Sequence, residues 1–235
     1  MSSHPPNELC PRALVDLPTS MTESVRQQSR FTFGTKAETL ERLKPLVSLG
    51  HWPEQLYFSV GAWRSSRAEI VRRILERLRA GRIVVRSSAR DEDVVNASKA
   101  GAYLSVLDVD PTPEALEGAV ESVIESYDDG HQEHQVLVQE HVTDIVVAGV
   151  VLTRDLDTGS PYYVINYDDS GRSDTVTGGT AENKAIFVLR KKVDSLRSTR
   201  FRTLMSIIRR IEKETGQNRL DIEFCIDGRD KVYIL

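Results

Sequence analysis

The sequence is poor in cysteine and has no long apolar run. Its 235 residues contain two cysteines, Cys10 and Cys225, and no CxxC pair. Neither a disulfide framework nor a cysteine-ligated zinc site is therefore predicted, and two free thiols suit a reducing compartment. The longest strongly apolar run, Ile145 to Leu152, is far shorter than the ~20 residues that a membrane-spanning helix needs.

The chain also has no excess of positive charge. Lys and Arg number 31 against 35 Asp and Glu, which gives a net charge of −4. A mild acidic excess argues against a general nucleic-acid binder, because such proteins usually carry a basic surplus. The N-terminus lacks the apolar core of a signal peptide. We therefore expect a cytoplasmic protein that binds neither membrane nor nucleic acid.

Composition and turn signals predict that the chain consists of an N-terminal extension and two lobes. Residues 1–30 are rich in Ser, Pro, Gln and Thr, and predict a flexible N-terminal extension. Order is expected from Phe31 onward. The turn at Asp128-Asp129-Gly130 suggests a boundary between an N-terminal lobe at 31–133 and a C-terminal lobe at 134–235.

Hydrophobic periodicity predicts both helices and strands. The helical pattern appears in four segments, 36–49, 68–80, 113–127 and 201–215. Alternating or short apolar runs predict strands at 56–60, 83–85, 103–107, 136–141, 145–153, 162–166, 185–189, 220–226 and 232–235. Strands outnumber helices in the second half. This order predicts an α+β fold with two lobes and largely antiparallel sheets.

Two carboxylates share one predicted strand. Asp221 and Glu223 are two residues apart in the strand 220–226, so their side chains lie on the same face. Neighbouring carboxylates repel each other unless a cation lies between them, and Mg²⁺ is commonly held by one or two carboxylates together with substrate phosphates. The pair is therefore a candidate magnesium site. A solvated polar face of an amphipathic strand is the open alternative.

Three cations occupy places where a phosphate could bind. Arg86 directly follows the predicted strand 83–85, Arg154 follows the strand 145–153, and Lys36 begins a predicted helix after Gly34 and Thr35. A guanidinium offers a planar fork of donors, and a helix N-terminus attracts anions. For both arginines an ordinary surface position is the alternative, and Thr35 can act simply as a helix cap.

Two further features are weaker. The glycine-containing stretch 175–180 could bring backbone close to a phosphate, although a plain turn explains it equally well. None of the five histidines lies in an obvious triad, and His131 and His134 are expected to be solvated loop residues rather than metal ligands.

Taken together, the motifs resemble the ATP-binding domain of the phosphoenolpyruvate synthase / pyruvate phosphate dikinase family. The resemblance covers residues from about 31 to the end of the chain. The matching pieces are GTKAETL at 34–40, IVVRSSARDED at 83–93, VLVQEHV at 136–142, GVVLTRDLDTG at 149–159 and LDIEFCID at 220–227.

The resemblance implies an ATP-grasp fold that clamps ATP and Mg²⁺ between two lobes. Lys36, Arg86 and Arg154 would grip phosphates and serve catalysis. Asp221 and Glu223 would hold the metal. The stretch from Val138 through Gln139 and Glu140 would lie near the adenine.

In the family's reaction, ATP gives its β-phosphoryl group to a histidine on a swivelling domain, and a further domain binds the acceptor. The resemblance therefore implies an ATP-dependent phosphotransferase domain that is incomplete for turnover alone. Its partners would be the phosphohistidine swivelling domain and the acceptor-binding domain of the same parent enzyme. The alternative is a non-catalytic nucleotide-binding regulatory module.

The motif style is closest to the relatives that phosphorylate L-glutamine. The family's glycine-rich GLGE-like stretch is replaced here by INYDDSGRSDTVTGG at 165–179, and TKAE occurs near the start at 35–38. The expected acceptor is therefore the L-glutamine amide or a pyruvate-like molecule. No GG…SH-like segment is present, and the chain ends before the Gln that usually completes the metal site, so a cut just short of that residue is expected.

Overall fold

A computed structural model describes residues 31–78, 81–89, 104–127, 130–155, 158–170 and 184–235. The predicted N-terminal extension and the glycine-containing stretch 175–180 lie outside the described residues. Within the described part, no helix is both long enough and apolar enough to cross a membrane.

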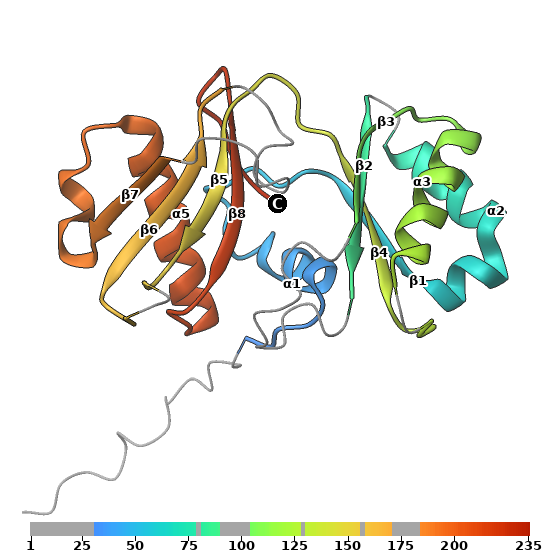
Figure 1. Cartoon of the computed structure of the whole chain (residues 1–235), viewed down its shortest axis with the longest axis horizontal. Helices are drawn as coiled ribbons and strands as arrows, with labels where there is room; N and C mark the ends of the chain where they lie inside the picture. The colour runs from blue at the N-terminus through green and yellow to red at the C-terminus, as the bar shows by residue number, and fades with distance from the viewer. Residues whose placement is uncertain (1–30, 79–80, 90–103, 128–129, 156–157, 171–183) are drawn as a thin grey trace, which may run out of the picture. The chain divides into compact units, whose positions relative to one another are not determined.

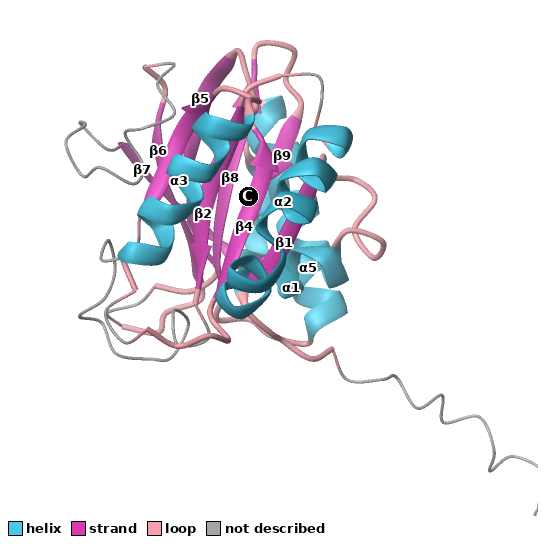
Figure 2. Ribbon diagram, turned by 90° about the vertical axis from the view of Figure 1, so that its right-hand side faces the viewer, coloured by secondary structure: helices cyan, strands magenta, loops and turns pink. Residues whose placement is uncertain are grey.

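A four-stranded antiparallel sheet forms one half of the fold. Its order is β1 (Gln55–Ser59), β4 (Gln135–Glu140), β2 (Ile83–Ser88) and β3 (Ser105–Val109). The helices α2 (Val60–Arg77) and α3 (Pro113–Glu125) cover one face of this sheet (Figures 1 and 2). The apolar residues between sheet and helices include Trp63, Ile74, Leu116, Val85 and Val138, all of them buried.

Local signals explain where these two helices begin. The Thr112 hydroxyl accepts a hydrogen bond from the Ala115 backbone, and Pro113 occupies the first turn, so α3 begins where the sequence predicts. The predicted start of the preceding helix at residue 68 is wrong. α2 begins directly after β1, where the Ser59 hydroxyl caps it, and it contains a non-helical residue at Ser66.

A five-stranded antiparallel sheet forms the other half. Its order is β7 (Lys184–Leu189), β6 (Tyr162–Asp168), β5 (Ile145–Leu152), β8 (Asp221–Asp227) and β9 (Val232–Ile234). Apolar side chains of this sheet share one buried core with the helix α5 (Thr199–Thr215), and the short 3₁₀ helix η1 (Arg190–Ser195) links β7 to α5. Gly216 ends α5 in the left-handed conformation, with φ of +67°, as glycine does at helix C-termini.

The first helix, α1 (Lys36–Leu43), lies between the two sheets (Figure 1). The Thr35 hydroxyl caps it, and it ends at Leu43, two residues before Pro45, instead of continuing to residue 49 as the periodicity predicts. Leu40 and Leu43 belong to the same buried cluster as Leu137 of β4 and the residues of α5. α1 therefore joins the core of the five-stranded sheet to a strand of the four-stranded one.

The predicted α+β class with two lobes and antiparallel sheets is confirmed. Details of the assignment differ. β4 follows residue 133, where the lobe boundary was expected, and it pairs with β1 and β2 in the four-stranded sheet. β2 was expected to end at Val85, but it continues through Arg86 to Ser88, and all six of its residues are buried.

Candidate functional site

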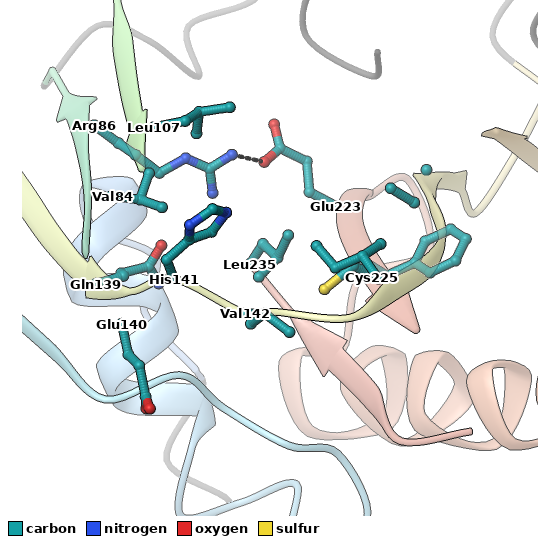
Figure 3. A pocket seen from close by; sticks show the side chains of 14 residues that line it. Val84, Arg86, Leu107, Gln139, Glu140, His141, Val142, Glu223, Cys225 and Leu235 are labelled. Carbon is teal, nitrogen blue, oxygen red and sulfur yellow. Dashed lines mark hydrogen bonds and ion pairs between the residues drawn. The ribbon is translucent and has the colours of Figure 1, made fainter. Parts of the chain in front are cut away.

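A cleft opens between the two sheets, with about 580 Å³ of empty space including the part open to solvent. Figure 3 shows side chains from both sheets pointing toward one another across it. The lining residues are Val84, Arg86, Leu107, Gln139, Glu140, His141, Val142, Ile145, Ala148, Gly149, Glu223, Phe224, Cys225 and Leu235. Charged groups of one sheet thus face a carboxylate of the other, and most of the remaining wall is apolar.

β8 brings the carboxylate into this cleft. Its residues alternate, so Ile222 and Phe224 are buried in the core shared with α5, whereas Glu223 lines the cleft. Asp221 lies two residues earlier and therefore on the face of Glu223; it is exposed at the start of the strand. The shared face of the two carboxylates agrees with the sequence prediction.

Three charged residues from three different elements, Lys36, Arg86 and Glu223, are in contact with one another through the Glu223 carboxylate. The ammonium nitrogen Nζ of Lys36 lies 2.8 Å from Glu223 Oε2, and Nη2 of Arg86 lies 2.8 Å from the same oxygen. Lys36 belongs to α1, Arg86 to β2 and Glu223 to β8. Two of the three cations that the sequence placed on phosphates are therefore adjacent in the fold, and an anionic group lies between them.

The ion-pair cluster of Lys36, Arg86 and Glu223 is largely buried but remains partly exposed to solvent. The exposed fraction of the side chain is 9% for Arg86, 21% for Lys36 and 32% for Glu223. Burial raises the pKa of Glu223, but the charges and hydrogen bonds of Lys36 and Arg86 outweigh it and lower the pKa to about 2. At neutral pH Lys36 and Arg86 therefore contact one ionised carboxylate, that of Glu223.

Backbone and side-chain hydrogen bonds fix the start of α1 beside β2. The amide of Ala37 donates to the Ser88 hydroxyl at 3.0 Å, and the hydroxyl of Thr35 donates to Gln135 Oε1 at 2.6 Å. These contacts hold Lys36 next to Arg86. The sequence gives both cations but not their proximity, because 50 residues and two other elements separate them.

The two residues expected near an adenine differ in environment. The side chain of Gln139 is buried in the cleft wall, and its Nε2 donates to Gln55 Oε1 at 3.2 Å. Glu140 is exposed, and its carboxylate points away from Arg86 and Glu223 (Figure 3). Gln139 therefore forms part of the cleft wall, while the carboxylate of Glu140 is turned away from the charged groups of the cleft.

Arg154, the third predicted phosphate ligand, follows β5 and is not one of the residues that line the cleft in the described part. Its Nη1 donates to the carbonyl oxygen of Gly159 at 3.0 Å, and its Nε donates to Asn218 Oδ1 at 3.2 Å. The structure thus brings Lys36 and Arg86 together with Glu223, whereas Arg154 is hydrogen-bonded to Gly159 and Asn218 outside the cleft lining.

Two small residues shape the floor. Cys225 is fully buried in β8, and burial raises the pKa of its thiol to about 12. Gly149 of β5 lies so close to β6 that an added Cβ would overlap the carbonyl oxygen of Asn166. The absence of a side chain at Gly149 therefore allows close pairing of β5 and β6 next to the cleft.

Two histidines depart from the sequence prediction. His134 was expected to be solvated, but it is buried, with its ring centroid 4.8 Å from that of Tyr127. His141 lines the cleft, although it was not predicted from the sequence as a site residue. Its position at the end of the predicted strand 136–141 was the available signal, but nothing in the sequence shows which neighbours it meets.

The carboxylates of Asp221 and Glu223 fit the donor chemistry of Mg²⁺, which prefers oxygen ligands. In the described residues there is no group of three or more His, Cys, Asp or Glu side chains that could hold a metal ion. Two carboxylates are nevertheless enough where phosphates and waters supply the other ligands. The two carboxylates therefore fit a metal whose other ligands come from phosphates and waters.

Comparison with known proteins gives no family. The sequence matches no family model and no curated protein. Solved structures that resemble the fold include a D-alanine–D-alanine ligase from Coxiella burnetii, at 13% identity and a TM-score of 0.48. D-alanyl-alanine synthetase A from Vibrio cholerae has 12% identity and a TM-score of 0.47, and the D-Ala:D-Ser ligase VanG from Enterococcus faecalis has 13% and 0.44.

Each of these matches covers 84% of the chain and 45%, 53% and 50% of the respective solved structure. The chain therefore spans about half the length of the structures that it resembles. Likenesses at this level say nothing about the substrate of this chain.

Proposed function

We propose that the chain is an ATP-grasp domain that binds Mg²⁺-ATP in the cleft between its two sheets. The observation that supports this most strongly is the meeting of Lys36, Arg86 and Glu223 from separate elements. Two cations held close together form a site for a polyphosphate, because each can form charge-assisted hydrogen bonds to phosphate oxygens. The apolar remainder of the lining suits a nucleobase.

In this proposal different residues bind different parts of the Mg²⁺-ATP ligand. Lys36 and Arg86 bind phosphate oxygens and orient the triphosphate. Glu223, together with Asp221, holds Mg²⁺, which would neutralise charge on the phosphates when bound. Glu223 lies against both cations in the described structure, so its carboxylate exchanges these partners for the metal when the nucleotide enters.

Calorimetric titration of Mg²⁺-ATP into the purified chain tests the proposal. We expect saturable binding with one nucleotide per chain, and a loss of about tenfold or more in affinity for Lys36→Ala, since a charge-assisted hydrogen bond is removed. Lys192→Ala, at an exposed lysine of η1, is the matched control and should bind normally. No binding to the wild-type chain, or equal binding by Lys36→Ala, contradicts the proposal.

We further propose that the domain serves a dikinase-type phosphotransferase. The support is the set of sequence motifs that contain Arg86, Arg154 and Glu223. The bond between the β-phosphorus and the oxygen bridging to the α-phosphate would break, so that AMP leaves and a histidine of another domain takes the phosphoryl group. Water takes the γ-phosphoryl group as inorganic phosphate, and the histidine passes its group to the L-glutamine amide or a pyruvate-like acceptor.

The nucleotide product distinguishes this reaction from ordinary kinase or ligase chemistry. In a protein that contains this chain with its histidine-bearing and acceptor domains, we expect AMP and inorganic phosphate from ATP. Formation of ADP without AMP contradicts the dikinase step but leaves nucleotide binding intact. If Arg86→Ala and Glu223→Ala leave the turnover rate unchanged, the chain is instead a non-catalytic nucleotide-binding regulatory module.

A further inference from the structure

His141 occupies the middle of the cleft without an assigned role. It directly follows β4, and its imidazole points into the cleft between Arg86 and Leu235 (Figure 3). Only 16% of its side chain is exposed. A polar ring enclosed in this way, among groups that would surround a ligand, is placed to contact that ligand directly.

One nitrogen of the ring faces away from solvent, toward Asp108 of β3. His141 Nδ1 is buried, has no hydrogen-bond partner in the described residues, and lies 3.5 Å from Asp108 Oδ1. Arg82 keeps the two residues together, because its carbonyl oxygen accepts from the amide of His141 at 2.9 Å and its Nη1 donates to the carbonyl oxygen of Asp108 at 3.2 Å.

This arrangement selects one tautomer of the neutral ring. A carboxylate beside Nδ1 favours the proton on that nitrogen, and the other nitrogen, Nε2, then carries a lone pair. Asp108 is thus a positioning residue. It leaves His141 with a hydrogen-bond acceptor, rather than a donor, for a ligand in the cleft.

The neighbouring side chains leave the polar recognition to His141. The nearby wall is apolar, with Val84, Leu107 and Leu235 among its residues. Two other polar side chains lie near His141 in the lining: Gln139 is 3% exposed and its amide nitrogen donates to Gln55, and the Glu140 carboxylate points away from Arg86 and Glu223 (Figure 3). A flat heterocycle can pack against such a wall, but a side-chain acceptor for its edge comes from the imidazole.

We propose that His141 selects the base of the nucleotide, and that it favours a base with an amino group over one with a carbonyl group at the same position. This inference rests on the proposed binding of a nucleotide in the cleft. An amino group of a 6-aminopurine donates to the acceptor nitrogen of His141. A 6-oxopurine instead presents a carbonyl oxygen, so two acceptors face each other and a hydrogen bond is lost.

Binding of Mg²⁺-ATP and Mg²⁺-ITP to the purified chain tests this choice, because the two bases differ at position 6 and in the protonation of the adjacent ring nitrogen. We expect the wild-type chain to prefer ATP by about tenfold or more. His141→Phe retains a ring of similar shape without an acceptor, and His141→Ala removes the ring. Both variants should reduce the ATP preference to about twofold or less, mainly by weakening ATP binding.

Two further variants separate the role of His141 from a general effect. His131→Ala, in an exposed loop, is the matched control and should keep the wild-type ratio. Asp108→Asn should reduce the ratio and should change the ¹⁵N shifts of the imidazole, because the bias toward the Nδ1 proton is weakened.

The outcomes distinguish the two proposals. If the wild-type chain binds both nucleotides equally, or if His141→Phe and His141→Ala retain the wild-type ratio, base selection by His141 is overturned while nucleotide binding stands. If the wild-type chain binds neither nucleotide, the proposed function itself fails and this inference fails with it.

Discussion

Lys36 Nζ lies 2.8 Å from Glu223 Oε2, although 187 residues separate the two in the sequence. The contact joins the first turn of α1 to β8 of the five-stranded sheet, and Arg86 of the four-stranded sheet contacts the same oxygen. The ion pair therefore links both halves of the fold at the point where we place the phosphates.

The first prediction concerns stability against pH. The pKa of Glu223 is about 2 in the folded chain against a usual value of 4.5, so the ionised carboxylate stabilises the fold above about pH 4.5, and this contribution is lost as the pH falls toward 2. We expect Glu223→Gln to lower the free energy of unfolding at pH 6 by about 2 kcal/mol, allowing for solvent screening.

Urea denaturation of the wild-type chain and of Glu223→Gln at pH 6 and pH 3 measures this effect. The difference between the two proteins should shrink at pH 3, because Glu223 then begins to take up a proton in the folded state. Glu125→Gln, on an exposed part of α3, is the control and should show little difference at either pH. If the difference in free energy of unfolding between the wild-type chain and Glu223→Gln is the same at pH 6 and pH 3, the ionised Glu223 does not stabilise the fold through Lys36 and Arg86.

The second prediction separates the two arginines. Arg86 contacts Glu223 in the cleft, whereas Arg154 is bonded to Gly159 and Asn218. We expect Arg86→Ala to weaken Mg²⁺-ATP binding by about tenfold or more, and Arg154→Ala to weaken it by less than about threefold. Isothermal titration of both variants measures the difference. Equal losses would show that Arg154 leaves its turn to reach the nucleotide, as the family resemblance implies.

The third prediction concerns the close approach of β5 and β6 at Gly149. A methyl group there would overlap the carbonyl oxygen of Asn166 and lie 2.9 Å from Tyr167 Cα, both of which belong to the neighbouring backbone. We expect Gly149→Ala to lower the free energy of unfolding by about 2–3 kcal/mol, since two paired strands must separate.

Gly118→Ala is the control, because it should raise the free energy of unfolding where Gly149→Ala lowers it. Gly118 lies in α3 with no atom within 4 Å of an added Cβ, so alanine should stabilise the helix by about 0.5–1 kcal/mol. Thermal unfolding followed by circular dichroism compares the two variants. A Gly149→Ala chain as stable as the wild type would show that β5 and β6 do not pair as closely as described.

The fourth prediction concerns Cys225. Its thiol is fully buried and has a pKa of about 12, so very little thiolate exists at pH 8. We expect iodoacetamide to label Cys225 at less than about one-hundredth of its rate in urea-unfolded chain. Peptide mass spectrometry separates it from Cys10. Rapid labelling of Cys225 in the folded chain would mean that the floor of the cleft is open to reagents.

Much of the fold follows from local sequence patterns, whereas the site depends on distant contacts. The start of α3 at Pro113, after the Thr112 cap, is set by neighbouring residues, so the sequence predicts it. α1 ends at Leu43, short of the predicted segment 36–49, because helices usually end at or before the residue that precedes a proline, here Pro45. The start of α2 was missed because Ser66, with φ of −143°, interrupts the helix. One helical period therefore cannot include Trp63 and the later apolar residues together.

The site shows the same limit. Arg86 could be chosen because it follows a predicted apolar strand and Glu223 because it shares a strand face with Asp221, yet their contact depends on how the two sheets face each other. The neighbours of His141 could not be predicted, since Asp108 belongs to β3, whose pairing with β2 contains a register shift. Individual site residues such as Arg86 and Glu223 could thus be predicted from the sequence, but the contacts between them could not.

The central claim is that the cleft holds the nucleotide with its phosphates on Lys36 and Arg86. A crystal structure of the chain with Mg²⁺ and a non-hydrolysable ATP analogue tests it most directly. We predict phosphate oxygens within hydrogen-bond distance of Lys36 Nζ and the Arg86 guanidinium, Glu223 turned toward the metal, and the base against Leu235. An analogue bound elsewhere, or an ion pair between Lys36 and Glu223 unchanged at saturating nucleotide, would contradict the claim.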